Sequence, residues 1–133
     1  MATYLVTGAN RGIGLEYCRQ IKERGDNVIA VCRSVSNELK DLDIQTETDI
    51  DITSDVSVNQ LVKKLEGKTL DVLINNAGII ERVNLNDLDF DSIRRQFEVN
   101  AVGPLRLTQA LLNNLKSGSK VIMMTSRMGS IDD

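Results

Sequence analysis

The sequence predicts an α/β fold, in which helices cover both faces of a doubly wound parallel sheet of about five strands. Continuous apolar runs alternate along the chain with longer segments of helical periodicity. Such runs are typical of strands that are buried on both faces, and the helices between them connect strands that run in parallel. A glycine-rich stretch also separates the first apolar run from the first helical segment. In this class of fold, ligands bind at the carboxyl ends of the strands, where that stretch lies.

The first half of the chain contains the clearest alternation of strand and helix signals. Ile13, Tyr17 and Ile21 lie four residues apart, as on one face of a helix, and Gly25 is a typical helix stop. The expected elements are, in order, a strand over Thr3–Thr7, a helix over Gly12–Arg24, a strand over Asn27–Cys32, a short helix over Val35–Leu42 and a weaker strand within Ile44–Ile52.

The second half continues the same pattern. Ser54 is a candidate helix cap and Gly67 a candidate stop, and a longer helical region is interrupted at Gly103-Pro104. The expected elements are a helix with Val58, Leu61, Val62 and Leu65 on its apolar face, a strand over Leu70–Ile74, a helical region over about Phe90–Leu115 and a fifth strand over Lys120–Thr125.

Composition and charge exclude several function classes. The 133 residues suffice for one domain, and a net charge of −3 argues against a nucleic-acid surface. No apolar run approaches the roughly 20 residues that span a bilayer, and the first residues have no export-signal pattern. The two cysteines, Cys18 and Cys32, form neither a disulfide framework nor a metal-ligand pattern. A cytoplasmic protein without a membrane or nucleic-acid partner is therefore expected.

The stretch TGANRGIG, Thr7–Gly14, places glycines at positions 8, 12 and 14 between a strand and a helix. Glycine permits a tight turn and a close approach of the backbone to a pyrophosphate, whose charge the helix N-terminus stabilises. A plain turn is the alternative, which the strand before and the helix after make less favourable. No Lys-Ser or Lys-Thr follows the last glycine, so the pattern is not that of a nucleoside-triphosphate loop.

Several motifs together resemble the short-chain dehydrogenase/reductase family. TGANRGIG resembles its cofactor loop and NNAG, Asn75–Gly78, its second signature; DIT, VNAVGP and TSRMGS follow its pattern at Asp51, Val99 and Thr125. The resemblance covers the whole chain and implies a Rossmann-type fold. Within this family, the chain is most similar to the C-factor-type branch, which is named for a signalling protein.

Residues of the glycine loop and of the second strand bear on which nicotinamide cofactor is bound. NAD-preferring folds carry an acidic residue after the second strand, whereas this chain has Arg33 there, and Arg11 lies in the glycine loop. Two guanidinium groups suit a 2′-phosphate, so NADP(H) is predicted over NAD(H), unless Arg33 is merely a solvated loop cation.

The resemblance implies further contacts to the cofactor. Asp51 and the Ile52 amide would face the adenine, although Asp51 could equally be a strand-end or turn residue. Asparagine after a strand also has a plain alternative, because its side chain bonds nearby backbone. The predicted cofactor residues are Gly8, Asn10, Arg11, Gly12, Ile13, Gly14, Arg33, Asp51, Ile52, Asn75, Ala77 and Gly78.

Asn100 lies four residues before Pro104, which has no N–H to bond the Asn100 carbonyl in a helix. The released carbonyl needs another partner, usually water. In the family that the chain resembles, the matching asparagine holds a water that connects the catalytic lysine to solvent. A kink required only for packing is the alternative.

Ser126 matches the family's catalytic serine, which orients a substrate carbonyl or hydroxyl. The resemblance implies a Tyr-x-x-x-Lys pair roughly a dozen residues later, whereas seven residues follow Ser126 here, and neither Tyr4 nor Tyr17 has a lysine four residues on. A lysine lowers the tyrosine pKa from near 10, which allows it to act as an acid. The chain is therefore expected to be the N-terminal portion of an NADP(H)-dependent reductase of small carbonyl or alcohol substrates, inactive by itself.

Two alternatives remain at this point, a non-catalytic NADP-binding or signalling protein and an inert fragment. Self-association is also expected. The fifth strand would be an open sheet edge, and the apolar helix faces around Leu107, Leu111 and Leu115 would be uncovered.

Overall fold

The centre of the molecule is a five-stranded parallel sheet, as the sequence predicts. The computed structural model describes residues 1–132, and its strand order is β3-β2-β1-β4-β5. The strands are β1 (Thr3–Thr7), β2 (Asn27–Val31), β3 (Gln45–Glu47), β4 (Leu70–Asn75) and β5 (Leu115–Met123). All four pairings are parallel, so the carboxyl ends of the strands meet at one edge. The doubly wound α/β class is confirmed.

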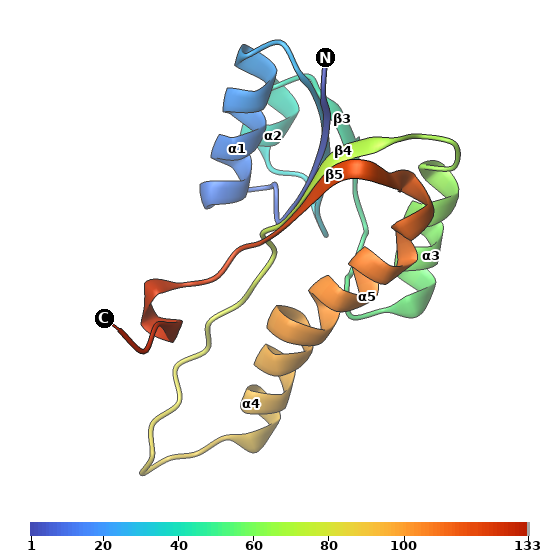
Figure 1. The fold of residues 1–133 in the computed structure, drawn as a ribbon. Coiled ribbons are helices and arrows are strands. Elements are labelled where there is room, and N and C mark those ends of the chain that lie inside the picture. The colour runs from blue at the N-terminus through green and yellow to red at the C-terminus, as the bar shows by residue number, and fades with distance from the viewer. Residues whose placement is uncertain (133) are drawn as a thin grey trace.

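Helices cover both faces of this sheet (Figure 1). On one face lie α1 (Gly12–Glu23) and α2 (Asn37–Asp41), and on the other lie α3 (Asp55–Lys64) and α5 (Gly103–Ala110). The helix α4 (Phe90–Phe97) continues into α5 through the π turn η1 (Glu98–Val102) and extends beyond the sheet. Two short 3-10 turns, η2 (Leu112–Asn114) and η3 (Arg127–Gly129), flank β5. No helix in the described part of the chain is both long and apolar enough to cross a membrane.

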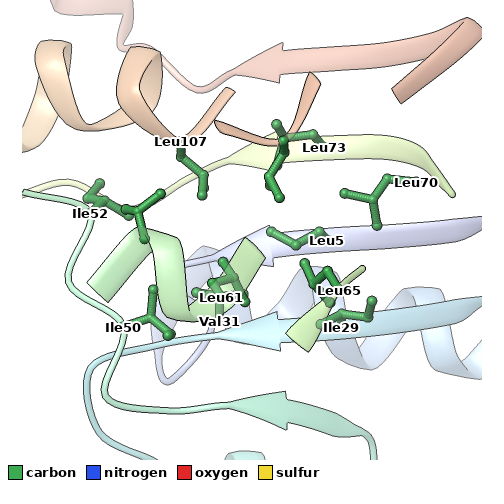
Figure 2. Close-up of a cluster of buried hydrophobic side chains, with 12 residues drawn as sticks. Leu5, Ile29, Val31, Ile50, Ile52, Leu61, Leu65, Leu70, Leu73 and Leu107 are labelled. Atoms are coloured by element: carbon green, nitrogen blue, oxygen red, sulfur yellow. The ribbon is translucent and has the colours of Figure 1, made fainter. Parts of the chain in front are cut away.

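Alternate residues of the strands supply two separate cores. Leu5 of β1 and Leu73 of β4 face α3 and α5, whereas Val6 and Ile74 face α1 and α2. Figure 2 shows the first core, where Leu107 of α5 and Leu61 of α3 approach the strand residues. The strands β1, β2 and β4 are thus buried on both sides, which explains why they read as continuous apolar runs.

The predicted apolar face of α1 is correct for Ile21, which is buried, and for Tyr17, which is partly buried against the core, but not for Ile13. The buried residues are Gly14, Cys18 and Ile21, which also follow helical spacing, whereas Ile13 is 62% exposed. Gly14 sets this rotation, because a Cβ atom at that position would collide with the Gly8 carbonyl oxygen. Only a glycine can bring the start of the helix so close to β1, and this contact decides which face turns inward.

The interruption of the long helical region begins earlier than Gly103-Pro104. In the π turn the Gly103 N–H donates to the Glu98 carbonyl, five residues back. Helix geometry resumes with Gly103 and Pro104 at the start of α5, where a missing proline N–H is tolerated. The predicted interruption of the helix is therefore present. It takes the form of a π turn, in which one extra residue is inserted into the helix, rather than a bend.

The prediction of uncovered helix faces was wrong for Leu107 and Leu111. Both are fully buried against α3 and the sheet, and Leu115 is partly buried as the first residue of β5. The expected open edge does occur, because β5 has one paired neighbour, β4, and its Val121, Ile122 and Met123 are exposed. The strand starts five residues before the predicted Lys120, through an irregular stretch containing Gly118.

Candidate functional site

The glycine loop lies at the carboxyl end of β1 and is closely packed against the end of β4. Gly8 and Gly12 have φ of +63° and +58°, a region that side-chain-bearing residues rarely adopt. A Cβ atom at Gly8 would lie 2.9 Å from the Ala77 Cα atom, and one at Gly14 would lie 2.6 Å from the Asn76 side-chain nitrogen. The three glycines therefore hold the loop in a shape that larger residues would destroy.

Thr7 and Asn76 tie the ends of β1 and β4 together. The Thr7 hydroxyl oxygen accepts hydrogen bonds from the Asn76 amide at 3.0 Å and the Ala77 amide at 2.9 Å. In return, Asn76 Nδ2 donates to the carbonyls of Thr7 at 3.2 Å and Gly8 at 3.4 Å. Sequence reasoning did not single out Thr7, although a hydroxyl residue at the end of an apolar strand was an available signal.

The first turn of α1 is left without a side-chain acceptor. In the described part of the chain, α2, α3 and α4 begin with capping side chains, Ser36, Ser54 and Asp89. The N-cap of α1 is Arg11, which makes no such bond, and no acidic residue lies in the first turn. Helix N-terminal amides without a capping side chain, next to a glycine loop, suit a phosphate group. The loop is also tied to α2, because Ser36 donates to the Asn10 carbonyl.

Asp51 is held in place by its neighbours. One carboxylate oxygen accepts from the Thr53 hydroxyl at 2.7 Å and the Thr53 amide at 2.9 Å, and the Asp51 amide donates to Ser57 Oγ at 2.7 Å. These Thr53 bonds, with the nearby Arg33 and Arg106, lower the pKa of Asp51. The carboxylate is thus an ionised acceptor with a fixed orientation. Arg33 shares this edge of the sheet with Asp51, and its side chain is exposed, as is that of Arg11.

The residues of NNAG point in different directions. Asn75 is buried and its Nδ2 donates to Thr108 Oγ1 of α5 at 3.2 Å, so its side chain braces the helix layer. Asn76, by contrast, bonds the glycine loop. Gly78 lies beside Asn100, because a Cβ atom added to it would be 3.2 Å from Asn100 Oδ1. The segment after β4 therefore runs between the glycine loop and the π turn.

Asn100 acts through its side chain as well as its place in the π turn. Its Oδ1 accepts from the Ile79 amide and its Nδ2 donates to the Ile79 carbonyl, both at 2.8 Å. Gln96, one turn earlier, donates to the Glu81 carbonyl at 2.8 Å. Sequence reasoning anticipated a role for the Asn100 backbone carbonyl and missed this paired side-chain contact, which depends on a residue 21 positions away.

Glu81 strengthens the same attachment. Its carboxylate accepts from Ser92 Oγ at 2.7 Å and from Arg95 at 2.7 to 3.1 Å. The Arg95 bonds, followed by that from Ser92, lower the pKa of Glu81. Together with Gln96, these residues fix the backbone of residues 79–81 along one face of α4.

Ser126 lies beyond the end of β5 and is exposed. Its hydroxyl oxygen accepts from the Met128 amide at 3.1 Å, as the cap of η3. The strand is extended toward it by the Met124 amide, which donates to the Asn75 carbonyl at 3.0 Å. The segments after β4 and β5 leave the same end of the sheet (Figure 1). Among residues 1–132, no group of three or more His, Cys, Asp or Glu side chains could hold a metal ion.

Comparisons with known proteins agree with this geometry. The family model described as short chain dehydrogenase matches residues 2–132. A 1-hydroxy-2-glutathionyl-2-methyl-3-butene dehydrogenase from Rhodococcus sp. (strain AD45) is 41% identical over 135 residues, covering all of this chain and 60% of that protein. Human retinol dehydrogenase 13 is 34% identical over 93% of this chain and 41% of its own length.

Solved structures give the same result. A carbonyl reductase from Pseudomonas aeruginosa PAO1, in complex with NADP, superposes with a TM-score of 0.92 and 32% identity over 99% of this chain and 64% of that one. The chain thus spans between 41% and 64% of the length of these three proteins.

Proposed function

The chain belongs to the short-chain dehydrogenase family, and on that premise we propose that it binds NADP(H) as part of an oxidoreductase that interconverts a small carbonyl compound and its alcohol. The observation that carries the proposal is the pairing of a tightly packed glycine loop with an uncapped helix N-terminus. A nicotinamide cofactor bound there supplies or accepts the hydride. The NADP named for the solved carbonyl reductase supports the choice of cofactor.

Each part of the site has a distinct task in this proposal. The backbone at Gly8, Asn10, Gly12, Ile13 and Gly14 binds the pyrophosphate, using the free amides of the first turn of α1. Arg11 and Arg33 bind the 2′-phosphate with paired donors. Asp51 and the Ile52 amide face the adenine, and the backbone around Asn75, Ala77 and Gly78 forms the wall beside the nicotinamide ribose.

Ser126 and Asn100 are assigned to the substrate side. The Ser126 hydroxyl donates a hydrogen bond to the substrate oxygen and orients it, while its oxygen continues to accept from the Met128 amide. Asn100 holds the Ile79 backbone and, through its own carbonyl, a water that relays protons. Proton donation needs a further acid, and neither Tyr4 nor Tyr17 has a lysine four residues later. We therefore propose that these 133 residues bind the cofactor without turning it over; steady NADPH oxidation by the pure chain with carbonyl substrates would contradict this.

The second candidate function is an NADP-binding protein of the C-factor-like branch that does not catalyse. The motif TSRMGS favours it. The coding sequence beyond residue 133 separates the two functions. A Tyr-x-x-x-Lys in the continuing frame supports the reductase, and a stop codon supports the binding protein.

Binding of NADPH and NADH to the purified chain, followed by nicotinamide fluorescence, tests the cofactor assignment. We expect NADPH to bind at least tenfold more tightly than NADH, and Arg33→Asp to remove this preference, since each tenfold corresponds to about 1.4 kcal/mol. Arg94→Asp is the matched control, because Arg94 is an exposed arginine of α4 that pairs with Asp91. Equal binding of both cofactors by the unmodified chain, or an unchanged preference in Arg33→Asp, would overturn the assignment.

We also propose that the protein forms a homo-oligomer. Large apolar side chains are exposed along α4, α5 and the turn after them, namely Phe90, Ile93, Phe97, Leu105 and Leu112. Exposed apolar side chains gathered on neighbouring elements favour association. Sedimentation analysis should detect a species larger than the monomer, and Phe97→Asp should shift it toward the monomer. A monomer at high concentration for the unmodified chain would contradict the proposal.

A further inference from the structure

Arg106 of α5 joins three elements that are far apart in the sequence. Its Nε donates to Asp55 Oδ1 at 2.8 Å, at the start of α3. One terminal nitrogen donates to the Ile52 carbonyl at 2.9 Å and also lies 2.9 Å from Glu98 Oε1, at the start of the π turn. The side chain is 22% exposed, far less than the arginines of α4. Of its carboxylate partners, Asp55 is 83% exposed and Glu98 is 39% exposed, so the contacts with Glu98 and the Ile52 carbonyl are the better shielded from solvent.

An apolar contact supports the same junction. Ile52 is buried, and a Cβ atom added to Gly103 would lie 2.7 Å from Ile52 Cδ1. The loop after β3 therefore rests directly on the backbone at the start of α5, while Arg106 bonds the loop's carbonyl from the same helix. Figure 2 shows Ile52 close to Leu107, the next residue of α5. Contact and hydrogen bond together set where Ile52 lies relative to α5.

The π turn is attached on its other side to the segment after β4. Glu98, the partner of Arg106, begins the turn, and Asn100, within it, holds both backbone groups of Ile79. A continuous chain of bonds thus runs from the loop at Ile52, through Arg106 and Glu98, to Asn100 and Ile79. Its two ends lie at the adenine and nicotinamide sides of the cofactor site proposed above.

We propose that Arg106 is a positioning residue, which fixes the adenine-side loop and couples it to the turn that carries Asn100. The inference rests on the proposed cofactor site. The guanidinium group reaches Asp55 through Nε and reaches the Ile52 carbonyl and Glu98 through a terminal nitrogen. A lysine has a single nitrogen on a flexible stem and can satisfy only part of these acceptors. Arg106 acts through the Ile52 backbone and Glu98 and touches no cofactor atom.

Two measurements on the full chain test this, with variants Arg106→Met, Arg106→Lys and Glu98→Gln. The first is the affinity for adenosine 2′,5′-bisphosphate, a probe for the adenine half alone. We expect about a tenfold loss for Arg106→Met, the scale of one lost charge-assisted hydrogen bond, and partial recovery in Arg106→Lys. Arg94→Met controls for loss of an arginine elsewhere.

The second measurement is amide hydrogen exchange, which does not depend on any cofactor. Arg106→Met should accelerate exchange of the Thr53 amide, in the adenine-side loop, and of the Ile79 amide, which Asn100 protects. Glu98→Gln should accelerate Ile79 with little change at Thr53. If Arg106→Met does not fold, the bisphosphate affinity and the amide exchange are both measured on Arg106→Lys and Glu98→Gln instead.

The outcomes separate the two proposals. If the unmodified chain binds neither NADPH nor the bisphosphate, the cofactor assignment fails, and the exchange pattern alone decides the role of Arg106. If the unmodified chain binds both and the Arg106 variants bind as tightly with unchanged exchange at Thr53 and Ile79, Arg106 is not a positioning residue.

Discussion

The end of β1 and the end of β5 reach the same edge of the sheet, yet they are built differently. At β1, Thr7 is buried and its hydroxyl accepts from two amides of the neighbouring segment, while Gly8 and Gly14 leave no room for a Cβ atom. At β5, Ser126 is exposed and its hydroxyl bonds a residue two positions away. The end of β1 is therefore shaped by long-range contacts, whereas the hydroxyl at the end of β5 is held by a local one.

This difference predicts that substitutions at the end of β1 and at the end of β5 will have unequal effects on stability and cofactor binding. Gly14→Ala should have the largest, because its Cβ atom would collide with the backbone of Gly8 and force α1 away from β1. We expect about 3 kcal/mol of destabilisation, from overpacking, and no measurable NADPH binding. Gly129→Ala is the control near Ser126, where the added atom meets ordinary contact, and unfolding by urea should separate the two. If Gly14→Ala and Gly129→Ala were equally stable, the ends of β1 and β5 would not differ in how tightly they are packed.

Thr7→Val keeps the shape of the side chain and removes its oxygen. The amides of Asn76 and Ala77 would then lose their acceptor in a buried site, at a cost of about 2 kcal/mol. Thr7→Ser retains the oxygen and should recover most of this loss. Chemical denaturation of the three proteins measures it, and a valine variant as stable as the serine variant would show that water replaces the hydroxyl.

Acid should weaken the contacts made by carboxylates. Hydrogen bonds hold the pKa of Asp51, Asp71 and Glu81 below their ordinary values, led by Thr53, the Thr3 amide and Arg95 respectively. A depressed pKa in the folded state adds stability above the unfolded value, near 4, and this is lost as pH falls through the folded pKa. The melting temperature should stay level from pH 7 to 5 and fall below pH 4. In Asp51→Asn the melting temperature should fall less steeply below pH 4. A profile identical to that of the unmodified chain would show that Asp51 does not contribute to the loss of stability in acid.

Ser126→Ala should have the smallest effect. The lost bond is local and solvent-exposed, so stability should change by less than about 0.5 kcal/mol, and NADPH affinity should not change. Calorimetry and the fluorescence titration measure both quantities. A loss of cofactor affinity in Ser126→Ala would show that the end of β5 is coupled to the end of β1.

Local patterns were sufficient for much of the fold. The strands β1, β2 and β4 were predicted within a residue because they are continuous apolar runs, and Ser54 caps α3 as its sequence context indicates. The rotation of α1 and the start of β5 were missed. Both depend on partners outside the element, Gly8 for α1 and β4 for β5, which periodicity within a window does not contain.

The candidate site divides in the same way. The sequence by itself determined the order of strands and helices, the glycine positions and the family signatures, because backbone conformation and apolar periodicity depend on residue type. Only the tertiary structure decided that Asn75 braces α5 while Asn76 bonds the glycine loop, and that Arg106 links Ile52 to the π turn. Such bonds join residues up to 69 positions apart, so their geometry exists only once the sheet and its two helix layers have packed.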